Sequence, residues 1–425
     1  MKKIFLIALI AVLAVGMLAC NNNNPAATSA APSVSATTAA PGGTPAAASG
    51  EKLTLNIGMY ADGADSYYQV LHDTLQACAD ADPACAWKVD YKVGQNTPAE
   101  QIQAVEDFIT AKYDALVVIQ NSPDATSECL QKTTQAGIPY FGAVHSFAGI
   151  PNATDAAGSC GFDFVQAGKY AGEDAAKRGV KKVIMIEGQL GQGTASAQSE
   201  GFLLAYEEAG KNMGGVTAKE LAEKKTGAKQ DGSQDITVVG WASGGWFAEP
   251  AQKAMTDYIT SLGPKGFDGV YVHNDPMMEG VLSAMQAAGL NPADYWLGSC
   301  NGREMSWDWV KDKTVTMDVN QSAALEGDTI YQQIKAYFTG QTYRKYVHPY
   351  LTPYNIDDIS TKSLVPFSDV AQYMEQRAAN QFPHDITGAE WTDMANMGGT
   401  GATASPAGTA SASPTASASA TAAAS

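Results

Sequence analysis

The chain of 425 residues contains few residue patterns that could carry catalytic chemistry. Its five histidines, at positions 72, 145, 273, 348 and 384, are scattered and lack the close spacing of metal ligands. The glycine-rich stretch 188–194 comes near a phosphate-binding loop but has no lysine to reach the phosphates. The stretch 242–245 is not the G-x-S-x-G turn that presents a nucleophilic serine, and no acid pair suits a hydrolase. We therefore expect a protein that is not an enzyme, with no metal site and no cofactor.

The cysteine at position 20 points to another chemistry, the attachment of lipid. A pair of lysines follows the first methionine, and the apolar run 4–18 is too short for a permanent membrane-spanning helix. The run ends in Ala19-Cys20 and resembles a bacterial lipoprotein signal peptide, although Met17 stands where Leu is usual. The resemblance implies that residues 1–20 are the signal peptide and that Cys20 becomes a lipid-carrying N-terminus. An ordinary secretory signal is the alternative, and either one places the protein outside the cytoplasm.

Uncharged segments of small and polar residues occur at both ends of the chain. Residues 21–50 are almost wholly Asn, Ala, Ser, Thr, Pro and Gly, which cannot bury enough apolar surface to offset their ordering entropy. We predict a disordered tether over 21–52, with a reach on the order of 30 Å. Residues 396–425 are predicted to be a disordered Ala/Ser/Thr/Pro tail. This tail is either plain disorder or a glycosylated or wall-threading segment.

Five cysteines remain besides Cys20, and an oxidising location permits disulfides between them. Cys78 and Cys85 bracket a helix-ending turn, so we expect a local bridge there. Cys129 with Cys160 is the second expected pair, which leaves Cys300 unpaired. No CxxC motif occurs, so a zinc ribbon or a thioredoxin-type site has no support.

The charge and length of the chain limit its partners and its architecture. The formal net charge of −17 disfavours nucleic acid and anionic lipid surfaces. The roughly 345 residues between the two tails are enough for two domains, each with a sizeable core.

Between the tails, segments with strand and helix patterns alternate, which is typical of βαβ units and parallel sheets. Residues 115–119 form a continuous apolar run, as expected for a strand buried on both faces. The stretch 211–234 is predicted to be a surface insertion. We predict strands at 53–59, 87–93, 115–119, 139–143, 181–187, 235–240, 268–272, 295–299 and 315–319, and helices at 66–79, 98–109, 124–136, 166–178, 195–210, 248–262, 276–288, 303–310 and 322–339. The fold class is therefore α/β, with two doubly wound parallel sheets. Ligands of such sheets bind beyond the carboxyl ends of the strands.

Several short segments resemble the periplasmic sugar-binding proteins of ABC transporters, of the type I or ribose-binding class. The resemblance covers about residues 53 to 345. It is carried by Asp65-Ser66-Tyr67-Tyr68, Ala136-Gly137-Ile138-Pro139, Glu187-Gly188, Gly193-Thr194, Glu200-Gly201-Phe202, His273-Asn274-Asp275-Pro276-Met277-Met278-Glu279-Gly280 and Ala287-Ala288-Gly289.

The resemblance implies two lobes joined by a three-strand hinge. It assigns residues 53–162 plus 322–343 to an N-terminal lobe and 163–321 plus 344–395 to a C-terminal lobe. It also implies a monomer whose partners are a small-molecule sugar or polyol and an ABC permease in the membrane.

The same resemblance, together with the positions that follow strands, implies a ligand site. A sugar needs aromatic rings for its C–H faces and polar side chains for its hydroxyls. Tyr67 also falls on a helical apolar stripe and could be core instead, and Asp275 could only cap a helix. The expected rings are Tyr67, Tyr68 and Trp246, and the expected polar residues are Asp65, His145, Asn274, Asp275, Asn301 and Gln321.

The chain departs from the family at positions that hold charge. One ligand arginine of the family aligns with Ser196 and another falls near Ala248, while Val144-His145 replaces an Asp-Arg pair. Asn301 stands where Asp is usual. These differences point away from ribose and toward another neutral sugar or polyol.

Two functions fit these features. One is a substrate-binding lipoprotein that delivers a sugar to an ABC permease. The alternative is a binding protein that presents a small-molecule signal to a chemoreceptor or histidine kinase.

Overall fold

The computed structural model describes residues 51–394 apart from 146, 148, 191 and 225–232. The expected signal peptide with Cys20, nearly all of the expected tether and the expected tail lie outside the described residues. In the described part of the chain, no helix combines the length and the apolarity needed to cross a membrane.

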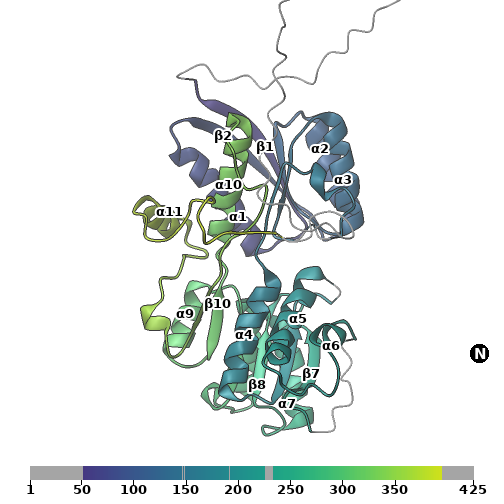
Figure 1. Ribbon diagram of the computed structural model, residues 1–425, viewed down its shortest axis with the longest axis vertical. Coiled ribbons are helices and arrows are strands. Elements are labelled where there is room, and N and C mark those ends of the chain that lie inside the picture. The colour runs from purple at the N-terminus through teal and green to yellow at the C-terminus, as the bar shows by residue number, and fades with distance from the viewer. Residues whose placement is uncertain (1–50, 146, 148, 191, 225–232, 395–425) are drawn as a thin grey trace, which may run out of the picture. The chain divides into compact units, whose positions relative to one another are not determined.

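Two sheets of mostly parallel strands form the framework of these residues (Figure 1). Only the pairs β11–β13 and β10–β12 are antiparallel. The first sheet runs β13 (Thr392–Asp393), β11 (Tyr346–His348), β5 (Gly158–Cys160), β4 (Tyr140–Ala143), β3 (Ala115–Ile119), β1 (Leu53–Ala61), β2 (Cys85–Val93). The second sheet runs β12 (Thr352–Asn355), β10 (Met317–Asn320), β9 (Trp296–Gly298), β8 (Gly269–Val272), β6 (Lys182–Glu187), β7 (Thr237–Ser243). The predicted α/β class with two parallel sheets is confirmed.

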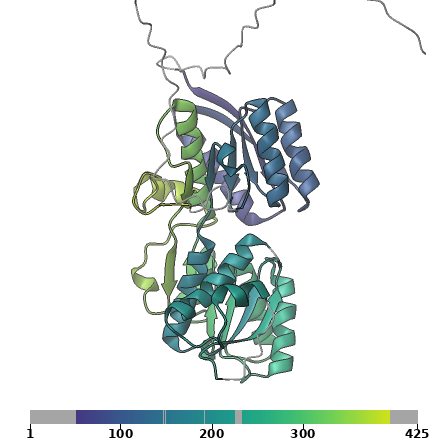
Figure 2. The same ribbon diagram turned by 45° about the vertical axis from the view of Figure 1, so that its right-hand side comes forward.

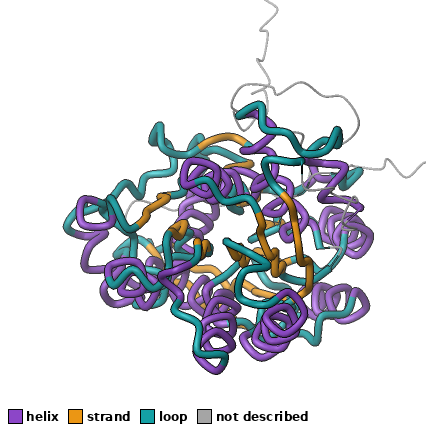
Figure 3. Tube along the Cα trace, turned by 90° about the horizontal axis from the view of Figure 1, so that it is seen from below, coloured by secondary structure: helices purple, strands orange, loops and turns teal. Residues whose placement is uncertain are grey.

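Helices cover both faces of each sheet, so that strands lie inside and helices outside (Figures 1, 2 and 3). The helices are α1 (Ser66–Ala81), α2 (Pro98–Thr110), α3 (Pro123–Ala136), α4 (Phe164–Arg178), α5 (Gly193–Glu208), α6 (Ala218–Lys224), α7 (Ala248–Leu262), α8 (Asp275–Ala287), α9 (Glu304–Lys311), α10 (Ala323–Thr339) and α11 (Val370–Ala378). On the first sheet, α1, α10 and α11 pack on one face, and α2 and α3 pack on the other. On the second sheet, α4, α5 and α6 share one face and α7, α8 and α9 the other. We call each sheet with its helices the first and second lobe.

Short polar residues begin several helices directly after strands. Ser122, Asn274 and Ser322 are the N-caps of α3, α8 and α10, and the side chain of each accepts a backbone N–H of the first turn. A proline follows in the first turn of α3 and of α8, where its missing N–H costs nothing. This local chemistry fixes where the chain turns at the carboxyl edges of the sheets.

The C-terminal part of the chain differs from the expected division. The sequence predicts residues 344–395 in the second lobe, but β11 and β13 pair within the first sheet and only β12 joins the second. The chain therefore passes between the sheets four times, after β5, β10, β11 and β12, whereas the expected hinge has three strands. The stretch 211–234 also differs from a plain surface insertion, because it contains α6, whose Leu221 is buried in the second lobe.

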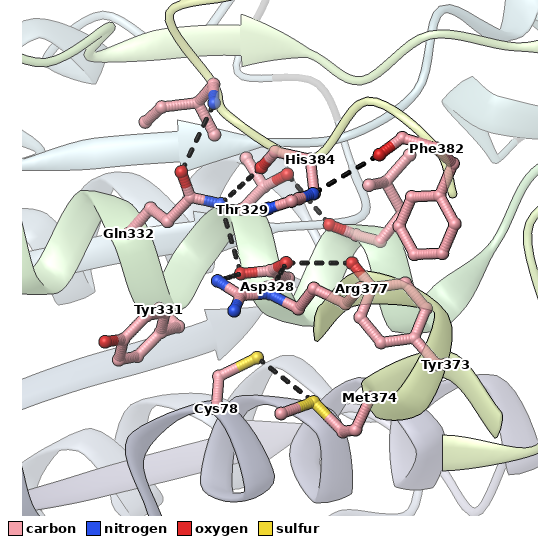
Figure 4. A network of polar contacts seen from close by, with 12 residues as sticks. Cys78, Asp328, Thr329, Tyr331, Gln332, Tyr373, Met374, Arg377, Phe382 and His384 are labelled. Atoms are coloured by element: carbon pink, nitrogen blue, oxygen red, sulfur yellow. Dashed lines mark hydrogen bonds and ion pairs between the residues drawn. The ribbon is translucent and has the colours of Figure 1, made fainter. Parts of the chain in front are cut away.

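A buried ion pair holds the last helix against the first lobe (Figure 4). Asp328 of α10 is fully buried and accepts hydrogen bonds from Nε and Nη2 of Arg377 at 2.5 and 3.0 Å. The hydroxyl of Tyr373 donates to the same carboxylate at 2.9 Å. Nearby, Nε2 of Gln332 donates to the carbonyl of His384 at 2.6 Å. These contacts explain why α11 and the segment after it belong with the first sheet.

The expected disulfides are not formed. All five cysteines of the described residues are buried and free. The thiol of Cys78 lies 3.7 Å from the sulfur of Met374 in α11, whereas the thiol of Cys85 faces the carboxylate of Asp82. Cys129 and Cys160 pack in the clusters on opposite faces of the first sheet, so the sheet itself separates them.

Candidate functional site

Side chains from the carboxyl ends of both sheets surround one cavity of about 60 Å³, which we call the first cavity. Of the nine expected ligand residues, all but Asp275 line it. They come from the segments that follow β1, β4, β7, β8, β9 and β10, with Tyr67 and Tyr68 in the first turn of α1. The expected residues that line the first cavity are Asp65, Tyr67, Tyr68, His145, Trp246, Asn274, Asn301 and Gln321.

The indole ring of Trp246 is held in place by its surroundings. Its backbone has a φ of 74°, directly after Gly244 and Gly245. Its Nε1 donates to Oε1 of Gln192 at 2.7 Å. The ring also lies on Gly188, where an added Cβ would come within 2.1 Å of it, so only glycine fits there. A fixed aromatic face of this kind suits stacking against an apolar ligand face.

The two tyrosines of α1 have different surroundings. Tyr67 is buried, and its hydroxyl donates to Oε2 of Glu326 at 2.5 Å. Its ring packs edge-on against Phe367, with ring centres 5.5 Å apart, so Tyr67 is as much core as site. The ring of Tyr68 is only partly buried, and its hydroxyl is hydrogen-bonded to Asp62, whose pKa is raised by burial to about 6.

The amide side chains at the site are already engaged with the protein. Oδ1 of Asn274 accepts from the backbone of Met277 at 3.0 Å, and its Nδ2 donates to the carbonyl of Trp246 at 3.1 Å. Gln321 accepts from the thiol of Cys300 at 3.3 Å and donates to the hydroxyl of Tyr67 at 3.4 Å. These amides therefore shape the site as well as line it.

The segment after β9 is packed tightly against β10. Asn301 has a φ of 112°, and its backbone carbonyl accepts from the backbone N–H of Gln321 at 2.8 Å. At Gly302, an added Cβ would lie 2.4 Å from Cα of Asn320. This close approach fixes the backbone on which Asn301 and Arg303 are presented.

Three buried polar atoms around the cavity have no hydrogen-bond partner among the described residues. They are Nε2 of His145, Oγ1 of Thr194 and Nε of Arg303. Burial lowers the pKa of His145 to about 4, so at neutral pH the imidazole is uncharged and offers one donor and one acceptor. An unpaired buried polar group costs about 1–3 kcal/mol, which a ligand hydroxyl at this place would recover.

Asp275 is the exception among the expected residues. Asp275 does not line the first cavity, and its carboxylate accepts from the hydroxyl of Ser299 and from the backbone N–H of Arg303, both at 2.8 Å. It is fully buried beside Asp318, and burial raises the pKa of both carboxyl groups. Asp275 therefore supports the backbone of Arg303, and its direct contact with a ligand stays a prediction.

Several lining residues were not expected from the sequence. Phe164, which begins α4, lines the cavity, as do Thr194, Gln198 and Arg303. Gln198 follows Thr194 by four residues, so both lie on the same face of α5. Ser196, where the alignment placed a family arginine, does not line the cavity; the helical spacing from Thr194 would have pointed to Gln198 instead.

The family of the chain follows from a comparison with family models. Residues 58–342 match the model described as periplasmic binding protein domain. The chain belongs to the periplasmic binding protein family. Membership of this family implies an extracytoplasmic location, and the expected resemblance is thereby confirmed.

Solved structures share the fold of this periplasmic binding protein at low sequence identity. A galactofuranose binding protein is 19% identical with a TM-score of 0.61, and the match covers 77% of this chain and all of that one. A solute binding protein from Actinobacillus succinogenes with bound D-allose is 19% identical, with a TM-score of 0.59 and coverage of 72% and 100%. The fructose binding periplasmic domain of a hybrid two component system is 17% identical, with a TM-score of 0.59 and coverage of 77% and 96%. A comparison with curated proteins found none that matches this sequence.

Proposed function

We propose that this periplasmic binding protein captures a neutral sugar or a related polyhydroxylated small molecule in the first cavity. In this proposal the protein is held at the membrane by lipid on Cys20. It then delivers the ligand to an ABC permease, as a monomer and without chemical change.

The observation that carries the proposal is the combination of unpartnered polar atoms with a fixed aromatic face. Oγ1 of Thr194, Nε2 of His145 and Nε of Arg303 are buried without a partner in the described structure, while the Trp246 ring is locked beside them. A sugar presents hydroxyls at its rim and C–H groups on its face, so it can satisfy both kinds of group at once. The galactofuranose binding protein and the solute binding protein with bound D-allose share this fold, which supports the same ligand class.

The ligand should hold the two lobes together, because its contacts come from both. Nη2 of Arg303 in the second lobe already donates to the hydroxyl of Ser66 in the first at 2.9 Å. Nδ2 of Asn96 donates to Oε1 of Gln189 across the same boundary at 3.1 Å. A ligand that touches both lobes favours the form in which these contacts exist.

A thermal-shift screen of sugars, polyols and nucleosides tests ligand binding. A ligand at one hundred times its Kd stabilises the folded state by about 2.7 kcal/mol, which raises Tm measurably. Thr194→Val tests the role of the unpartnered hydroxyl, because it removes that hydroxyl at nearly constant side-chain volume. We expect Thr194→Val to leave the ligand-free protein as stable as the parent or more so, and to weaken binding by roughly 1–2 kcal/mol. A screen without any stabilising sugar or polyol, or a Thr194→Val variant that binds normally, contradicts the proposal.

The proposed lipid anchor has its own test. Cys20→Ser should abolish acylation and leave the protein soluble or retained by an uncleaved signal. Mass spectrometry of the N-terminal peptide gives the result. An acyl group of equal mass in variant and parent would show that the lipid is carried elsewhere.

A second candidate function is presentation of the ligand to a membrane sensor. It is favoured by the similarity to the periplasmic domain of a hybrid two component system. Uptake of the labelled ligand separates the two functions. Loss of uptake on deletion of this gene supports delivery to a permease, whereas normal uptake with loss of a transcriptional response supports sensing.

A further inference from the structure

A second cavity adjoins the first and is much larger. Its volume is about 620 Å³, against about 60 Å³ for the first. Ligand pockets in proteins commonly measure about 300–1,000 Å³, so the second cavity falls in this range and the first is below it. His145, Phe164 and Thr194 line both cavities, so a single molecule could extend from one into the other.

The residues shared by the two cavities are suited to a ligand that crosses between them. Nε2 of His145 and Oγ1 of Thr194 are the unpartnered atoms described above, and Thr194 is only 5% exposed. Phe164 offers a ring at the same boundary. Polar atoms and an aromatic ring at the junction are what the bridging oxygen and adjoining faces of two linked sugar rings would contact.

The rest of the second cavity has the same mixed character. Phe162 adds an apolar surface, and Asn121 and His348 add polar groups. Nδ2 of Asn121 donates to Asn96 at 2.5 Å, which leaves its Oδ1 as an acceptor. Nδ1 of His348 donates to the carbonyl of Gly161 at 2.5 Å, so its Nε2 is the ring nitrogen left for a ligand.

Among the described residues, the second cavity also lacks a basic group that would select an anionic ligand. Asp163 is its acidic residue, and its Oδ1 is used to cap α4 by accepting from the backbone of Gln166 at 3.0 Å. No lysine or arginine is among the residues that line it. This lining offers no cationic side chain to hold an anion, and its polar groups and aromatic rings suit a hydroxylated ring with an apolar face.

We propose that the ligand is a disaccharide or similar two-ring glycoside rather than a free monosaccharide. One ring lies in the first cavity against Trp246. The other occupies the second cavity beside Phe162 and Phe164. This inference rests on the proposed function and names its substrate class more closely.

The test compares sugars that differ only by the second ring. Calorimetry measures the affinity of each single ring and of two-ring ligands that contain it. D-Galactose is compared with lactose and melibiose, D-fructose with sucrose, and myo-inositol with galactinol. We expect at least one two-ring ligand to bind about tenfold or more tightly than the single ring it contains.

A cavity-filling variant locates the second ring. Ala197 of α5 lines the second cavity and not the first, so Ala197→Phe should remove the preference for the two-ring ligand and keep single-ring binding. Ser196→Phe is the matched control on the same helix, because Ser196 lines neither cavity, and it should retain both affinities. If Ala197→Phe does not fold, Val165→Phe fills the same cavity from α4.

The outcomes separate this inference from the proposed function. Single rings that bind as tightly as their two-ring partners overturn the two-ring ligand and leave sugar binding intact. A two-ring preference that survives Ala197→Phe and Val165→Phe also overturns it, because the second ring then lies elsewhere. Failure of every single-ring and two-ring probe overturns the proposed function itself.

Discussion

At the scale of single residues, the side chains that line the first cavity are of two kinds. Some are hydrogen-bonded to the protein, and others carry a polar atom that has no partner among the described residues. Asn274 and Gln321 hold the backbone and the neighbouring side chains in place. His145 and Thr194 have polar atoms without partners in the described structure. Substitution of the first kind should cost both stability and binding, whereas substitution of the second kind should cost binding alone.

Trp246→Ala should weaken ligand binding by roughly 1–3 kcal/mol, because it removes buried apolar area and stacking. Calorimetry with the ligand found by the screen measures the change. Phe247→Ala is the matched control, since Phe247 is the next residue in the loop but is 57% exposed and does not line the first cavity. Equal affinities for Trp246→Ala and the parent would mean that the ring is not a ligand platform.

Glu326 should make stability depend on pH. Burial raises its pKa from 4.5 to about 7, although Tyr67 and the backbone of Val144 both donate to it. Between these values the folded state holds the proton and the unfolded state does not, so stability falls as pH rises from about 4.5 to about 7. The lowered pKa of His145 makes stability rise with pH between about 4 and 6.5. The pH dependence of the parent alone therefore does not isolate the contribution of Glu326.

Glu326→Gln isolates this contribution, because Gln can still accept from Val144 while donating to Tyr67. The stability of the parent relative to the variant should decline by up to about 3 kcal/mol across that pH range, judged from the size of the pKa shift. Urea unfolding at pH 5 and pH 8 gives the difference. A parent and variant whose stabilities run parallel over this range would rule out a titrating Glu326.

Most of the predicted residues line the first cavity because the loops at the carboxyl ends of parallel strands meet at one edge of each sheet. Trp246 and Asn301 could be expected from that rule alone. Asp275 could not be placed, because its partners Ser299 and Asp318 lie 24 and 43 residues further along the chain and turn its carboxylate into the sheet. The sequence does not predict Arg303, because its position depends on the positive φ of Asn301 and on the close packing of Gly302 against Asn320. Both features arise only in the folded structure.

At the scale of elements, long periodic segments were predictable and very short ones were not. The five residues of β3 are all buried, as their continuous apolar run indicates. β13 has two residues, both exposed, so no pattern of side chains marks it as a strand. β11 and α11 lie beyond the family resemblance, and only the pairing of β11 with β5 and the contacts of α11 with α10 reveal their place.

Arg377→Ala should destabilise the protein by about 3–5 kcal/mol, because it leaves the buried carboxylate of Asp328 without its charged partner. Urea unfolding measures the loss, and limited proteolysis should show earlier cleavage after α11. Lys253→Ala is the control, since its pair with Asp257 is largely exposed, and it should unfold as the parent does. An Arg377→Ala variant of parental stability would mean that the ion pair does not hold the C-terminal segment.

At the scale of the whole molecule, ligand binding and the contacts between the lobes should be linked. Ligand should lower the radius of gyration in small-angle scattering, because it bridges residues of both lobes. Arg303→Ala should reduce this compaction, because it removes both a lining residue and the bond to Ser66. A radius that stays constant at saturating ligand would show that binding does not draw the lobes together.

The buried thiols have a practical consequence for following this motion. Burial raises the pKa of Cys85 to about 11 and that of Cys129 to about 12, and it raises those of Cys78, Cys160 and Cys300 as well. The thiolate is the reactive form of cysteine, so maleimide dyes should not label these buried thiols. In a protein that begins after Cys20, a single cysteine introduced at the exposed Phe247 would take one fluorophore beside Trp246. We expect the fluorescence of this label to change when the proposed ligand binds beside Trp246.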